Sequence, residues 1–297
     1  MKRKMKNKHT YTTRIKKGLR PLPTDQRDFI HHQAFGSMNV AELPFYYEVS
    51  QNIWIKDQKD SDMCATCAGI GASEDQEQVE LCFEYQFAKA KELMGDWKSW
   101  GTNLRIVCKS LVKFGSLPQK YAPFTLESMG RDYCADWHNW DNKYDLYAKP
   151  FIKKSYFKIN KHTGKDLYDS LRIALWQNRN YRRSIVSGAL WRASWTSSEL
   201  IPIEYENDGI PHAFKIMGWT SQGLICQLSN GENIGDSGLF YMPREVANKE
   251  LNYGNFMFID IDPDVAKEMH KYNRIIAYLI AYIKKLKIKY DSTRNKK

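Results

Sequence analysis

The sequence contains no uninterrupted apolar segment that approaches the ~20 residues of a membrane-spanning helix. Glycine and proline are scarce, at 17 and 10 of 297 residues, which excludes a collagen-like or low-complexity chain. Neither a P-loop nor a dinucleotide-binding fingerprint is present, and no metal-ligand spacing occurs, so we expect no cofactor and no metal. The 42% of hydrophobic residues indicates a globular protein with one sizeable core or two lobes.

The cysteines are few and give no disulfide framework. There are six of them in 297 residues, and the basic N-terminus is not followed by the apolar segment of a secretory signal. We therefore expect reduced thiols and a cytoplasmic protein, with association with a virion as an alternative. Cys64 and Cys67 form a C-x-x-C pair, but no second pair accompanies them, which argues against a zinc site.

Positive charge is concentrated at the two ends of the chain. Residues 1–20 carry +9 and residues 284–297 carry +6 of a net +11, so the middle of the chain is at −4. Basic tails of this kind bind an acidic partner or a membrane surface, or are simply solvated. The aromatic residues of segment 133–147 alternate with aspartates rather than with lysine or arginine, so we predict no specific nucleic-acid site there.

The first half of the chain reads as mainly helical. A helix is predicted to begin near Cys64, with Ser61 or Asp62 as its N-cap. Its far end turns acidic at Glu74, Asp75, Glu77 and Glu80 and is expected to meet solvent. Two further helices are predicted at about 83–94, ending at Gly95, and at about 102–114.

The second half changes to strand-like segments after one helix at about 166–176. Strands are predicted at 184–195, 212–219, 224–228, 239–242 and 256–261, separated by turn residues. A helical half followed by a mainly strand half predicts an α+β fold of two lobes. An amphipathic basic helix is predicted at 263–289. The alternatives for this helix are docking on the domain, pairing with another chain and contact with a membrane.

Three residues have the chemistry of a thiol nucleophile site. Cys64 opens the first helix, where free amide donors and the helix dipole lower the pKa of a thiol. His212 opens an apolar strand far downstream and could supply an imidazolium next to that thiolate. Gln58 stands six residues before Cys64 and could donate its side-chain amide to an oxyanion. Each residue alone has an ordinary structural reading, such as a buried cysteine or a histidine at a strand start.

The segments around these residues resemble those of papain-like cysteine peptidases. In that family a glutamine also stands six residues before the nucleophile, and Gly209–Trp219 is similar to its G-x-x-H-A histidine strand. Gly235–Phe240 is similar to its closing W-G-x-x-G-Y-F segment, so the resemblance runs from about residue 43 to 245. It implies a helical lobe, a β-barrel-like antiparallel lobe and a cleft between them. It also implies Cys64 as nucleophile, His212 as general base and acid, and Gln58 in the oxyanion hole.

The sequence departs from the family at the residue that orients the histidine. The family uses an asparagine, and counting back from Gly235 without gaps places Leu228 at that position. Leucine cannot accept a hydrogen bond from imidazole, so the orienting residue is Asn230, is Gln227, or is missing. The family's usual inhibitory propeptide is longer than the segment before residue 29, so we expect no zymogen step of the usual kind.

The sequence thus predicts a basic arm over 1–28, a peptidase domain over 29–262 and a basic helix and tail over 263–297. The expected function is hydrolysis of peptide or isopeptide bonds in a protein or peptide substrate. The alternative is a pseudoenzyme that serves as a binding or assembly module through its tails, with oligomerisation through the last helix. A compact peptidase of this type also resembles phage- or virus-encoded members of the family.

Overall fold

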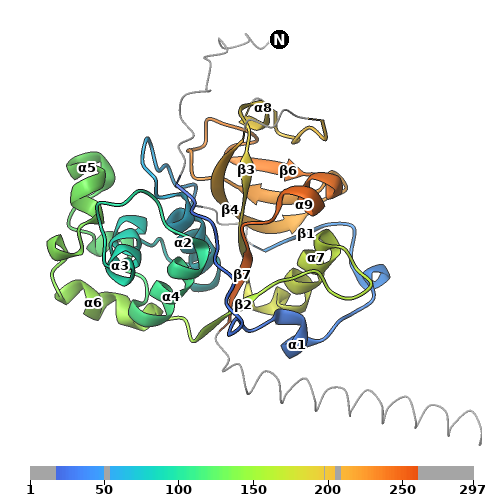
Figure 1. Ribbon diagram of the computed structural model, residues 1–297, viewed down its shortest axis with the longest axis horizontal. Coiled ribbons are helices and arrows are strands. Elements are labelled where there is room, and N and C mark those ends of the chain that lie inside the picture. Colours follow the sequence, from blue (N-terminus) through green and yellow to red (C-terminus); the bar gives the residue numbers. More distant parts are fainter. Residues whose placement is uncertain (1–17, 50–53, 197, 205–208, 260–297) are drawn as a thin grey trace, which may run out of the picture.

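The chain folds into a helical lobe packed against an antiparallel sheet (Figure 1). The computed structural model describes residues 18–49, 54–196, 198–204 and 209–259. The helical lobe is built from α2 (Cys64–Glu77), α3 (Phe83–Met94), α4 (Leu104–Phe114), α5 (Leu126–Ala135) and α6 (Lys143–Ala148). In α2 only the last two residues are not buried, and its alanines and glycines let neighbours approach on every side.

The sheet contains seven strands, in the order β2-β7-β3-β4-β5-β6 with β1 paired to β4. All of its ladders are antiparallel. The strands are β1 (Tyr47–Glu48), β2 (Ser155–Lys158), β3 (Ile185–Trp191), β4 (Ile210–Trp219), β5 (Leu224–Gln227), β6 (Leu239–Met242) and β7 (Asn255–Ile259). The sheet is flanked by α1 (His31–Phe35), α7 (Leu167–Gln177), α8 (Ala193–Thr196) and α9 (Arg244–Glu250).

Two hydrophobic cores match the two-lobe organisation that the sequence predicts. One core joins α7 and α9 to the sheet and includes Trp191, Phe214 and Leu228. The other lies among α2, α3 and α4 and reaches Ala213 of β4 and the phenylalanines of β7. Because α2 and β4 lie side by side, the lobes share one interface rather than a flexible linker. The predicted α+β two-lobe fold is therefore confirmed.

Most predicted elements occur within a few residues of their expected bounds. The 83–94 helix and the 239–242 strand match, and Gly95 ends its helix with a positive φ of 68°. The strand expected at 184–195 is shorter, because the chain turns into α8 after Trp191. The predicted helix at 263–289 and most of the basic arm lie outside the described residues.

The acidic end of α2 meets solvent only in part: Glu80 and Glu77 are 49% and 28% exposed, but Glu74 and Asp75 are buried, contrary to expectation. Glu74 and Asp75 are each 1% exposed, because α2 is covered by the sheet along this side. The N-cap prediction is also wrong. Met63 is the N-cap residue, without a side-chain cap, and Asp62 instead contacts an arginine of α5.

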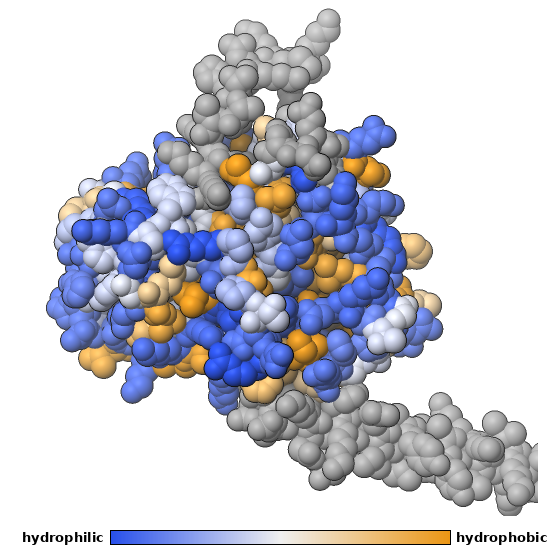
Figure 2. All heavy atoms as spheres, in the orientation of Figure 1, coloured by the Kyte–Doolittle hydropathy of each residue, from blue (hydrophilic) through white to orange (hydrophobic). Residues whose placement is uncertain are grey.

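The surface has no single large apolar face in the view of Figure 2, where apolar residues lie in small groups among polar ones. The most exposed large apolar side chain of the described chain is Phe45, at 94%. Within the same residues, no helix is long and apolar enough to cross a membrane.

Candidate active site

The predicted nucleophile lies at the interface of the two lobes. Cys64 is the first residue of α2 and is fully buried, as part of the helical-lobe core. The backbone amide of Ala213, which follows His212 in β4, donates a hydrogen bond toward its sulfur. The fold thus brings together two segments that are about 150 residues apart in the sequence. All six cysteines are free thiols.

His212 lies on the face of β4 that packs on the sheet core. It is paired with Ala189 of β3, is 0% exposed, and its ring contacts Trp191 edge-on at 6.2 Å between centroids. Its neighbour Ala213 points to the opposite face, toward Cys64 and the helical-lobe core. The predicted base is therefore positioned by a continuous strand, with an indole wall beside its ring.

Gln58 is held on both sides of its amide. Its Nε2 donates to the Ser61 carbonyl at 2.8 Å, and its Oε1 accepts from the Ser229 hydroxyl at 2.6 Å. The Gln58 backbone N–H donates to the Ser229 carbonyl at 2.8 Å. The amide is thus fixed in one orientation, with a second Nε2 hydrogen that Ser61 does not take. Ser229 was not identified from the sequence, because nothing in the local pattern links it to Gln58.

Leu228, at the position of the family's asparagine, and the two candidates for the orienting residue, Gln227 and Asn230, lie in different environments. Leu228 is 2% exposed and packs in the sheet core, in the same cluster as Trp191 and Phe214. Gln227 pairs with Lys215 and lines a small cavity with it, on the face of the sheet opposite to that of His212. Gln227 is therefore poorly placed to contact the His212 ring.

Asn230 lies at the edge of the cleft beside the Gln58 loop. It bridges to Asp57 and is 7% exposed. Its side-chain oxygen accepts no hydrogen bond from the described residues. It also lines an open cavity of about 140 Å³ with Asp57, Lys59 and Asp60. Buried polar atoms are nearly always hydrogen-bonded, so this unused acceptor is unusual.

An extended part of the N-terminal segment covers the nucleophile. Leu19 forms a parallel bridge with Thr102, where the Arg20 N–H donates to the Thr102 carbonyl at 2.9 Å and the Thr102 N–H donates to the Gly18 carbonyl at 3.1 Å. A Cβ on Gly18 would lie 2.9 Å from Cys64 Sγ, so only glycine fits this approach. We call residues 18–22 the strap. It runs between the two lobes in Figure 1, and it was not expected from the sequence.

Burial under the strap changes the acidity of the nucleophile. Loss of water around the sulfur raises the pKa of Cys64 to about 12, although the backbone amide of Ala213 counteracts this. The negative charge of Asp62 raises it further, and the backbone amides of Ala65 and Gly18 lower it. With the strap in place, the thiol is therefore protonated at neutral pH.

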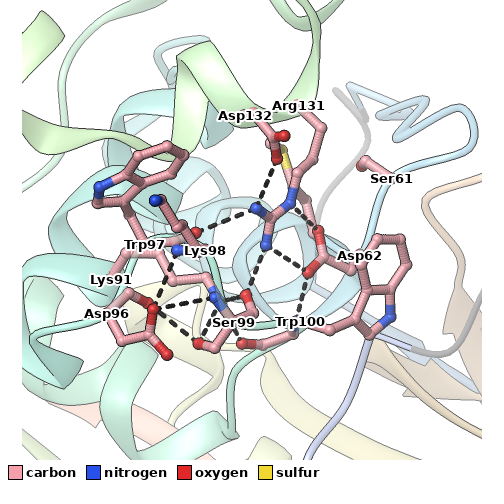
Figure 3. A network of polar contacts seen from close by, with 12 residues as sticks. Ser61, Asp62, Lys91, Asp96, Trp97, Lys98, Ser99, Trp100, Arg131 and Asp132 are labelled. Atoms are coloured by element: carbon pink, nitrogen blue, oxygen red, sulfur yellow. Dashed lines mark hydrogen bonds and ion pairs between the residues drawn. The ribbon is translucent and has the colours of Figure 1, made fainter.

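A polar network fixes the loop on which the strap lies (Figure 3). The Arg131 guanidinium donates to Asp62 at 3.0 and 2.9 Å, and to the carbonyl oxygens of Trp97 and Ser99. Asp62 also accepts from the Gly101 N–H, one residue before the strap's partner Thr102. The segment before Cys64 and the rim of the cleft are thus tied to one arginine, which carries no signal in the sequence.

No metal site accompanies these residues in the part of the chain that the structure describes, where no three histidine, cysteine or acidic side chains are grouped as ligands. A scan against protein-family models found no match, and a search of curated proteins found none either. Solved structures do match.

The structural matches are cysteine proteases. Xylellain from Xylella fastidiosa superposes with a TM-score of 0.68 at 19% identity, over 83% of this chain and 96% of that one. The Carica candamarcensis protease CMS1MS2 gives 0.56 at 12% identity, over 74% and 100% of the two chains. Bromelain from Ananas comosus gives 0.54 at 14% identity, over 73% and 99%. This chain therefore has the papain-like fold, as the sequence motifs indicated.

Proposed function

We propose that the protein is a cysteine peptidase in which Cys64 is the nucleophile, His212 the general base and acid, and Gln58 an oxyanion donor. The observation that carries the proposal is that the Ala213 amide, next to His212 in β4, contacts Cys64, while the Gln58 amide is fixed on the segment that leads into the Cys64 helix. It is supported by the papain-like fold, since the matched structures are cysteine proteases. The substrate bond is a peptide or isopeptide bond.

The reaction needs only the chain's own groups and a water molecule. His212 takes the Cys64 proton, and the thiolate sulfur attacks the substrate carbonyl carbon, while its oxygen accepts hydrogen bonds from the Gln58 amide and the Cys64 backbone N–H. The imidazolium then protonates the departing amine as the C–N bond breaks. His212 next deprotonates a water that attacks the thioester carbonyl, and the thiol is regenerated.

The strap has to leave the cleft before a substrate can bind. It occupies the backbone hydrogen-bonding positions of Thr102 and contacts Cys64, so it competes with an extended peptide for the same surface. The full chain is then a closed form in equilibrium with an open one. Asn230 is our candidate for orienting the imidazole in the open form, because its oxygen is buried and unused.

A pseudoenzyme that binds a partner is the second candidate function. It is favoured by one observation, the apolar Leu228 packed in the sheet core at the position of the family's orienting asparagine. Loss of an orienting residue reduces, but does not by itself abolish, thiol chemistry.

Hydrolysis of a fluorogenic peptide library distinguishes the peptidase from the pseudoenzyme. We expect turnover by the full chain, increased when the strap is weakened and lost in both Cys64→Ala and His212→Ala. A library that stays uncleaved by every strap-weakened form would overturn the peptidase proposal and favour the binding module.

A further inference from the structure

Two ion pairs lie buried beneath the candidate active site. Lys215 Nζ is 3.0 Å from Asp75 Oδ1, and Lys56 Nζ is 2.6 Å from Glu74 Oε1. The four side chains are between 1% and 8% exposed. Glu74 also accepts from the Leu81 N–H at 2.7 Å, and Lys56 donates to the Leu81 carbonyl at 3.1 Å. Charged groups are almost never buried to this degree without a specific arrangement.

The partners come from the three segments that carry the candidate catalytic residues. Glu74 and Asp75 are adjacent residues of α2, the helix that begins at Cys64. Lys215 lies three residues after His212 in β4, and Lys56 lies two residues before Gln58. One turn of α2 is therefore tied to both the histidine strand and the glutamine loop.

The surroundings of the pairs keep them rigid. The cavity between them is lined by Lys56, Lys215, Gln227 and Cys67 among others, and its volume of about 10 Å³ is the size of a single water. Bulk water therefore does not screen the charges. Lys215 crosses α2 at Gly71, where its Nζ also donates to the Gly71 carbonyl at 3.4 Å.

Such pairs determine geometry more than they determine stability. The cost of removing two charges from water offsets most of their attraction, so a buried pair adds little to the free energy of folding. Its best-attested use is to select one register between elements. A shift of β4 by one residue along α2 would separate Lys215 from Asp75 and would displace the His212 backbone by about 3.3 Å relative to the start of α2.

We propose that Asp75 and Lys215 are positioning residues that hold β4 against α2 in the register at which His212 can exchange a proton with Cys64. Glu74 and Lys56 do the same for the loop of Gln58. The role rests on the proposed peptidase function, because it concerns the relative placement of the same three residues.

The test compares two double variants of the full chain. Asp75→Asn with Lys215→Met removes the pair without leaving a buried charge, as either single change would. The control is Glu77→Gln with Lys153→Met, which removes a pair of the same kind from the same helix but ties α2 to the segment before β2. Lys153 is fully buried, as Lys215 nearly is, while Glu77 is 28% exposed, so the control matches the loss of a buried lysine.

Two readouts follow. The first is the rate of Cys64 alkylation across pH 5–10, read by intact mass. We expect the Asp75/Lys215 variant to lose at least ten-fold of the neutral-pH rate, because its open form no longer pairs the thiolate with an imidazolium, while the control keeps the wild-type profile. The second is the set of backbone amide NMR shifts of Cys64 and His212, which we expect to move in the first variant and not in the control.

The outcomes separate this proposal from the peptidase function. The positioning role alone would be overturned if Cys64 is activated in the wild-type chain and both variants show the same pH profile and the same amide shifts as the wild type. Absence of activated labelling in every form would count against the peptidase function. The amide shifts would then still decide the positioning role, with equal shifts in the two variants overturning it.

Discussion

Replacing Leu19 by alanine should open the cleft and accelerate reaction of Cys64. Leu19 is 1% exposed and is the main apolar anchor of the strap, in one cluster with Cys64 and Ala213. Truncation to alanine removes about 2 kcal/mol of apolar burial from the closed form. Since 1.4 kcal/mol corresponds to a factor of ten, the fraction of open molecules should rise about 30-fold while the closed form still dominates.

The assay is the second-order rate of labelling by an epoxysuccinyl inhibitor at pH 7. We expect Leu19→Ala to label about 30-fold faster than wild type, since the strap no longer shields the sulfur. The matched control is Leu146→Ala in α6, a leucine that is 69% exposed, which should label at the wild-type rate. The increase should disappear in Leu19→Ala with His212→Ala. A rate unchanged by Leu19→Ala, in a variant with native circular dichroism, would refute the strap as the barrier.

Three further results are expected. Gln58→Ala should lower peptide hydrolysis by about 10²–10³-fold, the usual loss for an oxyanion donor, with a native circular dichroism spectrum as the check that folding is intact. Arg131→Met should destabilise the fold by about 3–5 kcal/mol in urea unfolding, because it leaves Asp62 buried without its cation; a loss below 1 kcal/mol would contradict this. Burial raises the pKa of Glu74 from 4.5 to about 7, so the native state binds that proton more tightly than the unfolded chain. The contribution of Glu74 to the free energy of unfolding is therefore greatest below pH 4.5 and is lost as the pH rises to about 7. The variant Glu74→Gln should flatten this decline of the unfolding free energy with pH.

Local signals in the sequence were sufficient for much of the fold. The helix ending at Gly95 and the strand over 239–242 follow from apolar periodicity and from turn residues that stand next to them. Cys64, His212 and Gln58 were identifiable because their neighbours form recognisable segments. The two-lobe division followed from the change from helical to strand periodicity along the chain.

The errors and omissions have a common physical cause, which is a partner distant in the sequence. Glu74 and Asp75 look like a solvated helix end until Lys56 and Lys215 are brought against them from other segments. Asp62 has the local pattern of an N-cap, but its actual partner is Arg131 of α5, which is distant in the sequence. The strap depends on the fit of Gly18 against Cys64, which no local pattern records.

The most direct test of the central claim is intact-mass labelling with an epoxysuccinyl inhibitor at neutral pH, followed by mapping of the modified residue. We predict a single adduct on Cys64 in the wild-type chain, absent in Cys64→Ala and strongly slowed in His212→Ala, because activation of the thiol requires the imidazole. An adduct on another of the six cysteines, or labelling of Cys64 that is indifferent to His212, would contradict a Cys64–His212 catalytic pair.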